Sequence, residues 1–291
     1  MILAKAVVRQ SKHIFQHKLL RIANCNNAPV KIVWFWPEKP HPYTVVYRVF
    51  HRLGIIIKQG VPDVKRGQTG FLWLDDTYVP PPPVSSLVNG NCLDISKEKV
   101  DAIHSRIFGY SLSVDPLMYV GRMVCKSNLN GAHDGIELAG PLKEKQADSV
   151  YQRIVDNRPA DGNEKLVSDY RIAIFGGHIG FGYNKLRPKT SRFSNTNAKV
   201  SIEEDMAGVF SVHEIQKIEE FCEAFHLDYG ELDVVRDYTA KDIYILDVNK
   251  TPLGPPNGLT EADHQRAFGL LVRCFLKWIN SGWSSPKAGR S

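Results

Sequence analysis

The stretch from residue 229 to residue 258 carries side chains that could bind a metal ion. Asp233 is predicted on one β-strand (231–236) and Asp247 and Asn249 on the next (243–248), so a hairpin would bring the three together. Asp247 and Asn249 are two residues apart, and this spacing points both to the same face of a strand. Two carboxylates and an amide offer the oxygen ligands that Mg²⁺ accepts, with phosphate oxygens and water completing its octahedron. The spacing therefore predicts a magnesium site that could receive a phosphate group.

Two alternatives for this stretch stay open. Asp and Asn at a strand end often only cap a turn, although the Thr-Pro pair and the Gly/Pro-rich loop that follow Asn249 favour the metal. Glu231 lies two residues before Asp233 and faces the same side of its strand. It could be the first metal ligand or bridge to a second ion, and the sequence does not choose between them.

Short strands and helices alternate through the part of the chain that must position these residues. A β-α-β pattern is predicted, with strands at 31–36, 54–58 and 70–75 and a helix at 44–53. The prolines at 80–83 must be extended. Ser96 is a plausible cap for a helix at 95–108. Strands at 119–126, 150–155, 168–175 and 178–185 suggest one small antiparallel sheet. A capping box at Ser211 opens a helix that runs to about residue 226, and a closing helix covers about 260–279.

Composition and charge limit the class of protein. The chain has 291 residues, of which 43% are hydrophobic and 23% charged, and no apolar run approaches the length of about 18–20 residues that a membrane-spanning helix needs. Residues 1–37 hold six of the 37 basic residues and none of the 31 acidic ones, so the rest of the chain is balanced despite a net charge of +6. No nucleic-acid partner is therefore expected. The five separated cysteines form no CxxC pair, and this pattern favours a cytoplasmic protein without disulfides or a zinc knuckle.

The first 24 residues have a pattern of their own. Apolar residues recur at roughly helical spacing between the basic ones, which predicts an amphipathic cationic helix and not a secretory signal. Such a helix could pack on its own domain, pack on a second copy of the chain in a homodimer, or touch an anionic membrane surface. The predicted organisation is this helix (1–24), an N-terminal β-α-β lobe (25–94), a central lobe (95–190), a C-terminal lobe with the metal site (191–280) and a flexible tail (281–291).

Several pieces of residues 95–275 resemble, in order, the ATP-grasp superfamily in its glutathione-synthetase-like and glutamate-ligase-like branch. The segment RMVCK, which ends at Lys126, resembles the strand that carries the family's nucleotide-phosphate lysine, and SNLNGAHDG (127–135) resembles its phosphate-covering loop. The segment QRIV (152–155) lies where the family has its adenine hinge. The segments DYR (169–171), LDVVR (232–236) and LDVN (246–249) resemble the family's Asp-x-Arg strand and its two metal-ligand strands.

This resemblance implies a fold and a set of site residues. The fold is a mixed α/β (α+β) one, an ATP-grasp fold in which the nucleotide lies between a small antiparallel-sheet lobe and a C-terminal α+β lobe, after a short β-α-β lobe. Asp233, Asp247 and Asn249 would bind Mg²⁺, and Lys126, Arg171 and Arg236 would act on the phosphates, with Arg187 and Arg192 converging on the same cleft. ATP would also be bound by a further set of residues, namely Asn130, Gly131, His133, Gln152, Arg153, Ile154 and Val155.

The resemblance also implies an activity. The family's chemistry is that of an ATP-dependent ligase, which phosphorylates a carboxylate to an acylphosphate that an amine attacks, giving an amide, ADP and phosphate. The partners would then be ATP, Mg²⁺ and small-molecule carboxylate and amine substrates. A kinase that phosphorylates a small molecule or sugar, a nucleotide-binding protein without activity and a membrane-peripheral protein stay open as alternatives.

Overall fold

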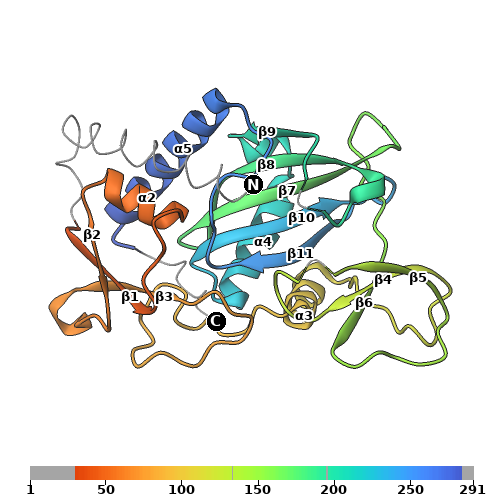
Figure 1. The fold of residues 1–291 in the computed structure, drawn as a ribbon, viewed down its shortest axis with the longest axis horizontal. Helices are drawn as coiled ribbons and strands as arrows, with labels where there is room; N and C mark the ends of the chain where they lie inside the picture. The colour runs from red at the N-terminus through yellow and green to blue at the C-terminus, as the bar shows by residue number, and fades with distance from the viewer. Residues whose placement is uncertain (1–29, 133, 195, 284–291) are drawn as a thin grey trace, which may run out of the picture.

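The computed structural model describes residues 30–132, 134–194 and 196–283. Its strands form three sheets with helices packed on them (Figure 1). The predicted N-terminal helix (1–24) lies outside the described residues. The strands are β1 (Ile32–Pro37), β2 (Ile56–Gln59), β3 (Thr69–Trp73), β4 (Gly121–Ser127), β5 (Ile136–Gly140), β6 (Ser149–Arg153), β7 (Leu166–Phe175), β8 (His178–Pro188), β9 (Lys199–Glu203), β10 (Tyr229–Arg236) and β11 (Ile243–Asn249). The helices are α2 (Val45–Arg52), α3 (Lys97–Phe108), α4 (Val212–Phe225) and α5 (Glu261–Asn280), with short 3₁₀ turns at Val64–Arg66, Lys189–Ser191 and Met206–Gly208.

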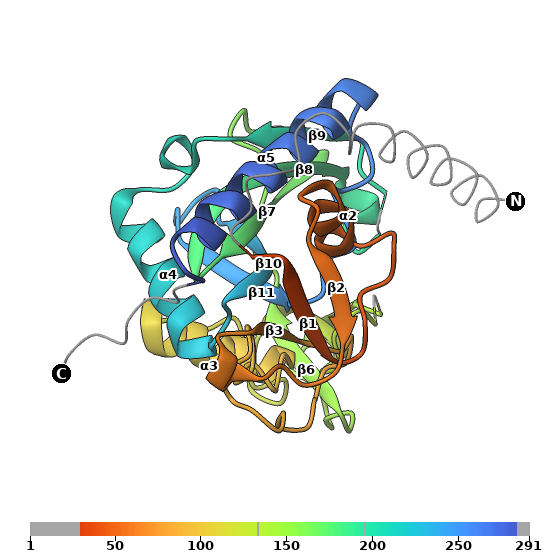
Figure 2. The same ribbon diagram turned by 90° about the vertical axis from the view of Figure 1, so that its left-hand side faces the viewer.

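The first lobe has the predicted β-α-β arrangement. Its three strands are parallel in the order β2-β1-β3, with α2 linking β1 to β2. Alternate residues of β1, Val33 and Phe35, are fully buried and belong to one apolar core with Phe50 of α2 and Phe275 of α5. Figure 2 shows α2 and α5 next to each other above these strands. The first lobe is therefore packed directly on the C-terminal helix.

The four strands expected to form one small sheet belong to two different sheets, so that prediction is wrong. β4 and β6 form a three-stranded antiparallel sheet in the order β5-β4-β6, whereas β7 and β8 join a five-stranded antiparallel sheet in the order β11-β10-β7-β8-β9. The long strand β7 pairs with β10, and the core side chains Ile172 and Leu232 lie opposite each other. This burial of apolar side chains stabilises a pairing between strands that are far apart in the sequence. The five-stranded sheet spans residue 190, the predicted boundary between the central and C-terminal lobes.

One face of the five-stranded sheet is covered by α3 and α4, and part of the other by α5. Ile172, Leu232 and Val234 point to the first face and pack in one core with residues of both helices. Ala173 and Phe181 point to the second face and pack with α5 and the first lobe. Ser96 caps α3 by accepting a hydrogen bond from the Lys99 N–H, and the capping box at the start of α4 is present. The polar residues of the candidate site lie on the part of the second face that α5 does not cover.

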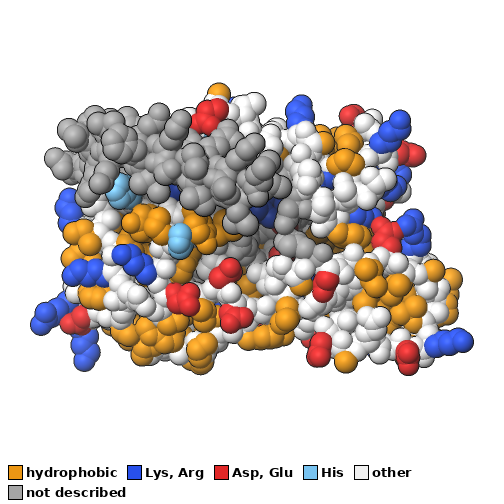
Figure 3. All heavy atoms as spheres, in the orientation of Figure 1, with side chains coloured by type: hydrophobic (Ala, Val, Ile, Leu, Met, Phe, Trp, Pro, Cys, Tyr) orange, Lys and Arg blue, Asp and Glu red, His pale blue; other side chains and the backbone are white. Residues whose placement is uncertain are grey.

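The surface of the small sheet exposes apolar side chains. Met118 and Val120, which precede β4, are 77% and 82% exposed, and Ile136 of β5 is also exposed. Figure 3 shows hydrophobic side chains gathered over this part of the molecule.

Within the described residues, none of the helices has both the length and the apolar character needed to cross a membrane.

Asn89 links the first lobe to the five-stranded sheet. Its side chain is fully buried, and its Oδ1 accepts hydrogen bonds from the backbone N–H groups of Asp228 (2.9 Å) and Tyr229 (3.0 Å). Its Nδ2 donates to the Tyr229 carbonyl (2.7 Å), and its backbone N–H donates to the Asp228 carboxylate (2.7 Å). The residue has a left-handed backbone conformation (φ 59°), which asparagine tolerates better than most residues. One side chain therefore satisfies three backbone groups at the start of β10.

We expect Asn89→Ala to lower the free energy of unfolding by about 3 kcal/mol, because it leaves buried backbone groups without partners and places alanine at a positive φ. Urea unfolding of the full chain measures this loss. Asn91→Ala is the matched control, since Asn91 is exposed and two residues away, and it should change the value by less than about 0.5 kcal/mol. Equal stability of the two variants would contradict the role given to Asn89.

Candidate functional site

Three neighbouring strands of the five-stranded sheet bring acidic and basic side chains to one face. Asp233 on β10 lies directly opposite Asp247 on β11 and opposite Arg171 on β7. Glu231 lies opposite Asn249. Cross-strand neighbours and residues two apart share a face, so all five side chains are on the same side of the sheet. The predicted hairpin therefore brings Asp233, Asp247 and Asn249 together.

A β-bulge helps to orient Asp247. The pairing of β10 with β11 shifts between Asp233 and Val234, whose partners are Asp247 and Ile245, so Leu246 is the extra residue. Ile245 is buried in the core on the α3 and α4 side of the sheet. An extra residue reverses the alternation of side chains, and Asp247 therefore faces the same side as Asp233 although Ile245 faces the other.

Asp233 is held by two cations. Arg171 donates from Nε to Oδ1 (3.0 Å) and from Nη2 to Oδ2 (2.9 Å), and Lys185 of β8 donates from Nζ to Oδ1 (2.8 Å). Burial raises the pKa of Asp233, but Arg171 and Lys185 outweigh it and keep the pKa well below its usual range. The charge of Asp233 raises the pKa of Arg171 further above its ordinary value. A carboxylate has about four lone-pair sites, so Oδ2, with one donor, can accept a further ligand.

Asp247 has an oxygen without a partner. Its Oδ1 is covered by the protein and makes no hydrogen bond. Burial, followed by the charge of Asp233, raises the pKa of Asp247 to about 6, and Lys97, Lys126 and Arg171 only partly offset this. A buried carboxylate oxygen without a donor is unfavourable. A bound cation would supply what this atom lacks.

Asn249 takes part in a turn as well as in the site. Its Oδ1 accepts a hydrogen bond from the Thr251 N–H (3.0 Å), as in the turn-capping alternative. The Thr251 hydroxyl in turn donates to Asp75 of the first lobe (2.7 Å). Among the described residues, no group of three or more His, Cys, Asp or Glu side chains is arranged to hold a metal ion. The predicted set contains an amide as well as two carboxylates, and one of its buried oxygens, Asp247 Oδ1, has no hydrogen-bond partner.

Two lysines lie on the side of the site formed by α3 and β4. Burial, followed by the charge of Lys97, lowers the pKa of Lys126 to about 8, and Asp247 and Asp134 oppose this. Lys97 is 8% exposed and donates to the Leu129 carbonyl of the loop that follows β4. Burial also lowers the pKa of Lys97, with Asp247 as the strongest opposing charge. The buried Lys97 and the half-buried Lys126 form a positive region near Asp247 that is suited to phosphate oxygens.

Lys97 and Lys185 were not predicted from the sequence. Lys97 is the first residue of α3, next to the Ser96 cap, where the helix dipole disfavours a cation. A lysine at the first position of a helix is the signal that the sequence offered, whereas its burial, which requires an anion nearby, is seen only in the structure. Lys185 alternates with Tyr183 and Arg187 along β8, and this period-two pattern would have placed all three on one face.

The loop from residue 127 to residue 135 joins the central lobe to the first lobe. The Asn130 N–H donates to the Thr77 hydroxyl (2.9 Å), while the Asn130 Oδ1 is buried without a partner. Gly131 has a φ of 70°, which favours glycine. The Ser127 N–H donates to the Asp134 carboxylate at 3.1 and 3.3 Å. His133, predicted to contact the nucleotide, lies outside the described residues.

The predicted adenine hinge lies beside an apolar cluster. Gln152 is a buried residue of β6, and the Arg153 N–H donates to the Leu112 carbonyl (2.9 Å). Ile154 follows, and Val155 packs with Leu112, Val235 and Tyr244, with Leu246 against them. One apolar cluster thus contains Val155, at the end of the hinge, and is contacted by Leu246, the residue before Asp247.

Arg236 is not part of the site, and the prediction that it converges on the same cleft is wrong. Its guanidinium pairs with Glu214 of α4 (2.6 Å) and donates to the Val209 carbonyl (3.0 Å), on the other face of the sheet. The reason is alternation, because Arg236 lies three residues from Asp233 on the same strand. Its role here is to anchor the start of α4.

Arg187 and Arg192, which were predicted to converge on the same cleft, are both mostly buried. Arg187 pairs with Asp169, its side chain being 12% exposed. Arg192 donates to the Val155 carbonyl (3.1 Å) and to the Asn157 side chain (2.8 Å). Arg192 therefore contacts the end of the predicted hinge, and Arg187 lies two residues from Lys185 on the site face.

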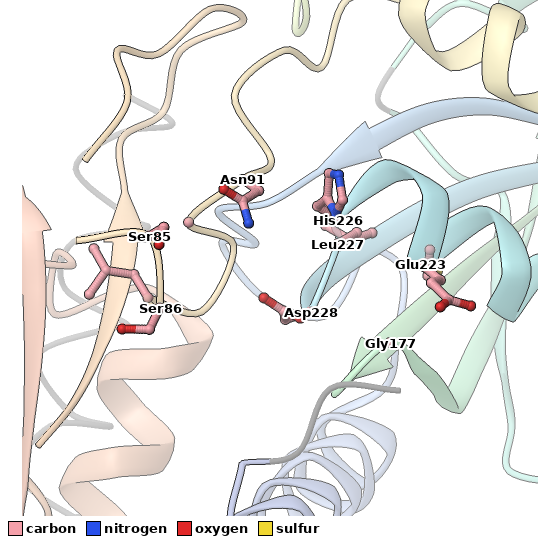
Figure 4. Close-up of a pocket in the computed structure, with 11 residues that line it drawn as sticks. Ser85, Ser86, Asn91, Gly177, Glu223, His226, Leu227 and Asp228 are labelled. Carbon is pink, nitrogen blue, oxygen red and sulfur yellow. The ribbon is translucent and has the colours of Figure 1, made fainter. Parts of the chain in front are cut away.

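A separate pocket of about 400 Å³ lies where the first lobe meets the turn between α4 and β10 (Figure 4). Figure 4 shows Ser85, Ser86 and Asn91 on one side and Glu223, His226 and Asp228 on the other. The pocket contains none of the predicted site residues. The polar residues of the sheet face remain the candidate site because they combine unpartnered charge with buried cations.

Comparisons with known proteins support the fold. No protein-family model matches the sequence, and no curated protein matches it either. The solved ATP-grasp ligase PsnB, complexed with a minimal precursor, Mg and ADP, is 10% identical, with a TM-score of 0.51 over 90% of this chain and 99% of that chain. The D-alanine–D-alanine ligase from Bacillus anthracis is 12% identical, with a TM-score of 0.49 over 87% of this chain and 96% of that one. The chain therefore has the ATP-grasp fold, and the resemblance seen in the sequence is confirmed at the level of the fold.

Proposed function

We propose that the protein is an ATP-dependent ligase that joins a carboxylate to an amine. The observation that carries the proposal is the pairing of Asp233 with Asp247, because Asp247 keeps an unpartnered buried oxygen near the buried Lys97 and the half-buried Lys126. The unpartnered oxygen of Asp247 suits a metal ion, and the two lysines beside it suit the phosphate that the ion would accompany. The PsnB structure, which shares the fold, contains Mg and ADP.

The described residues fit Mg²⁺ and ATP. Asp247, Asn249 and the open side of Asp233 offer oxygen ligands of the kind that Mg²⁺ prefers. When bound, the ion neutralises charge on the phosphate oxygens. Lys126 and Lys97 would contact phosphate as point charges, and the backbone of the loop that contains Asn130 and Gly131 would lie over it. The base would lie against residues 152–155 and Leu246, where the apolar cluster provides a flat contact.

The reaction needs no nucleophile from the protein. An oxygen of the substrate carboxylate attacks the γ-phosphorus of ATP, the bond to the β–γ bridging oxygen breaks, and ADP leaves with an acylphosphate formed. The amine nitrogen then attacks the acyl carbon, phosphate leaves, and the nitrogen loses a proton as the amide forms. Lys97, Lys126 and Arg171 hold the charged groups in place, and such fixed charges are worth most where water is excluded.

Thermal unfolding with Mg²⁺ and ATP, separately and together, tests the nucleotide site. We expect the wild type to be stabilised only when both are present, by about 2.7 kcal/mol at a hundredfold excess over Kd. Asp247→Asn should lose this stabilisation, because the amide cannot supply a charged ligand. Glu220→Gln, at an exposed position of α4, is the control that changes charge equally and should keep it.

Product analysis then separates a ligase from a kinase. With Mg·ATP and a panel of carboxylates, a ligase releases phosphate when an amine is added and forms an amide. A stable phosphorylated product without need of an amine would indicate a kinase in place of the ligase. No stabilisation of the wild type by Mg·ATP would overturn the proposal itself.

A further inference from the structure

Two buried polar groups next to the candidate site take no part in it. Glu231 is 4% exposed, and its Oε2 has no hydrogen-bond partner. Tyr183 of β8 is 1% exposed, and its hydroxyl also has none. Buried polar atoms without partners are rare in folded proteins. Their presence together on the site face points to a missing ligand.

The sheet register places the two groups around one small residue. Glu231 lies opposite Ala173 of β7, and Tyr183 lies opposite Arg171, two residues from Ala173 on the same face. The methyl group of Ala173 leaves more room between β10 and β8 than a larger side chain would. Burial raises the pKa of Tyr183, and the charge of Glu231 is the next largest cause. Both observations indicate that the carboxylate and the hydroxyl lie near each other.

Glu231 has an ion-pair partner in Arg171, but this cation gives its Oε2 no hydrogen bond. Arg171 approaches it most closely, with 3.7 Å between Nε and the Glu231 Oε2. Its Nε and Nη2 already donate to Asp233. The Nζ of Lys185 also donates to Asp233. The missing partner is therefore a cation, because a phosphate or a carboxylate would be repelled by Glu231. A protonated nitrogen can also donate a hydrogen bond to the Tyr183 oxygen, which a metal ion cannot do.

We propose that Glu231 and Tyr183 form the subsite that binds the nitrogen of the amine substrate as an ammonium ion, which releases one proton to solvent before its lone pair attacks the acylphosphate. This inference rests on the proposed ligase function and adds the chemical class that the acceptor must have. Glu231 lies opposite Asn249 and two residues from Asp233, so a nitrogen bound there is next to the place where the phosphate would be transferred. An ammonium ion offers three donors, of which one or two would satisfy the Glu231 Oε2 and one the Tyr183 oxygen. Glu231 would therefore favour acceptor substrates that carry a positive charge.

Thermal unfolding of the full chain in Mg·ADP tests the subsite with matched small probes. The probes are ethanolamine and putrescine as cations, ethylene glycol as the neutral analogue and glycolate as the anion. We expect the two amines to stabilise the wild type, while the glycol and the glycolate do not. Glu231→Gln, which keeps the shape of the side chain, should weaken amine binding about tenfold or more, and Tyr183→Phe should weaken it less. Glu220→Gln should leave it unchanged.

Each other outcome has a definite meaning. If no amine stabilises the wild type while Mg·ATP still does, the subsite is overturned and the nucleotide site stands. If Glu231→Gln loses the Mg²⁺-dependent stabilisation by ATP and keeps amine binding, Glu231 is a metal ligand and the subsite is again overturned. If Glu231→Gln does not fold, Glu231→Asp and Tyr183→Phe give the same comparison. If amines bind but Mg·ATP does not, the ligase proposal fails and the cation subsite remains.

Discussion

Replacing Arg171 by methionine is expected to lower the free energy of unfolding by about 3 to 5 kcal/mol, as measured by urea unfolding at pH 7. The variant leaves Asp233, whose side chain is 23% exposed, with Lys185 as its remaining cation partner and removes both donors of the guanidinium. Removing one partner of a largely buried ion pair is destabilising, because the other charge loses much of its compensation. The long side chain of methionine keeps most of the packing of the arginine stem.

The surface pair of Arg66 with Asp63 provides the matched control. It is also an Arg–Asp pair (3.2 Å), but its side chains are 81% and 48% exposed. Arg66→Met should change stability by no more than about 1 kcal/mol. If Arg171→Met lowered the free energy of unfolding by no more than Arg66→Met does, Asp233 would not depend on Arg171.

The loss in free energy of unfolding caused by Arg171→Met should also depend on pH, in a direction that follows from the pKa of Asp233. The folded-state pKa of Asp233 is depressed by its cation partners, so the pair contributes stability above the unfolded-state pKa of about 3.9 and loses it as the pH falls through the folded-state value. The difference between wild type and variant should therefore be full at pH 7 and shrink only well below pH 4.

Replacing Lys126 by alanine is expected to reduce kcat/KM for Mg·ATP by about 10²-fold to 10³-fold, as removal of a donor to developing charge does in other enzymes. The half-buried amine of Lys126, near Asp247 and Lys97, is the charge that would contact the phosphates. With a pKa of about 8, Lys126 loses its proton within the accessible pH range. The kcat/KM of the wild type should therefore fall as the pH is raised through about 8, whereas the variant should not show this step.

Lys143→Ala is the control for this variant, since Lys143 is an exposed lysine of the same lobe. It should leave kcat/KM for Mg·ATP and its pH profile unchanged. Binding of Mg·ATP to Lys126→Ala as tight as to the wild type, measured by calorimetry, would remove Lys126 from the phosphate site. The stability of the variant is checked by urea unfolding, so that a loss of folding is not mistaken for a loss of binding.

Local patterns in the sequence predicted the parts of the fold that short segments determine. The β10–β11 hairpin, the capping box at Ser211 and the Ser96 cap each depend on residues within a few positions of one another. The hairpin also brings Asp233, Asp247 and Asn249 together, since a spacing of two on a strand decides which face a side chain occupies. The bulge at Leu246 was not visible in that spacing, although it sets the orientation of Asp247.

Long-range pairing explains most of what the sequence did not predict. β7 was assigned to the wrong sheet because its partner β10 lies more than fifty residues later, and only the buried contact of Ile172 with Leu232 identifies it. β5 and β9 are edge strands with partly exposed, mixed side chains, so they lack a clear apolar alternation. Arg236 was misplaced although its odd spacing from Asp233 was available in the sequence.

The contacts of the segment after β3 have a consequence for protein engineering. Asp75 accepts a hydrogen bond from Thr251 at the end of β11, and Thr77 accepts one from Asn130 in the phosphate loop. Two residues of the first lobe, Asp75 and Thr77, thus contact two parts of the candidate site. A chimaera that takes its first lobe from a relative should keep residues 75–77 of this chain, with the crossover placed before Asp75. Moving the crossover beyond Thr77 would exchange the first lobe and these contacts with the candidate site together.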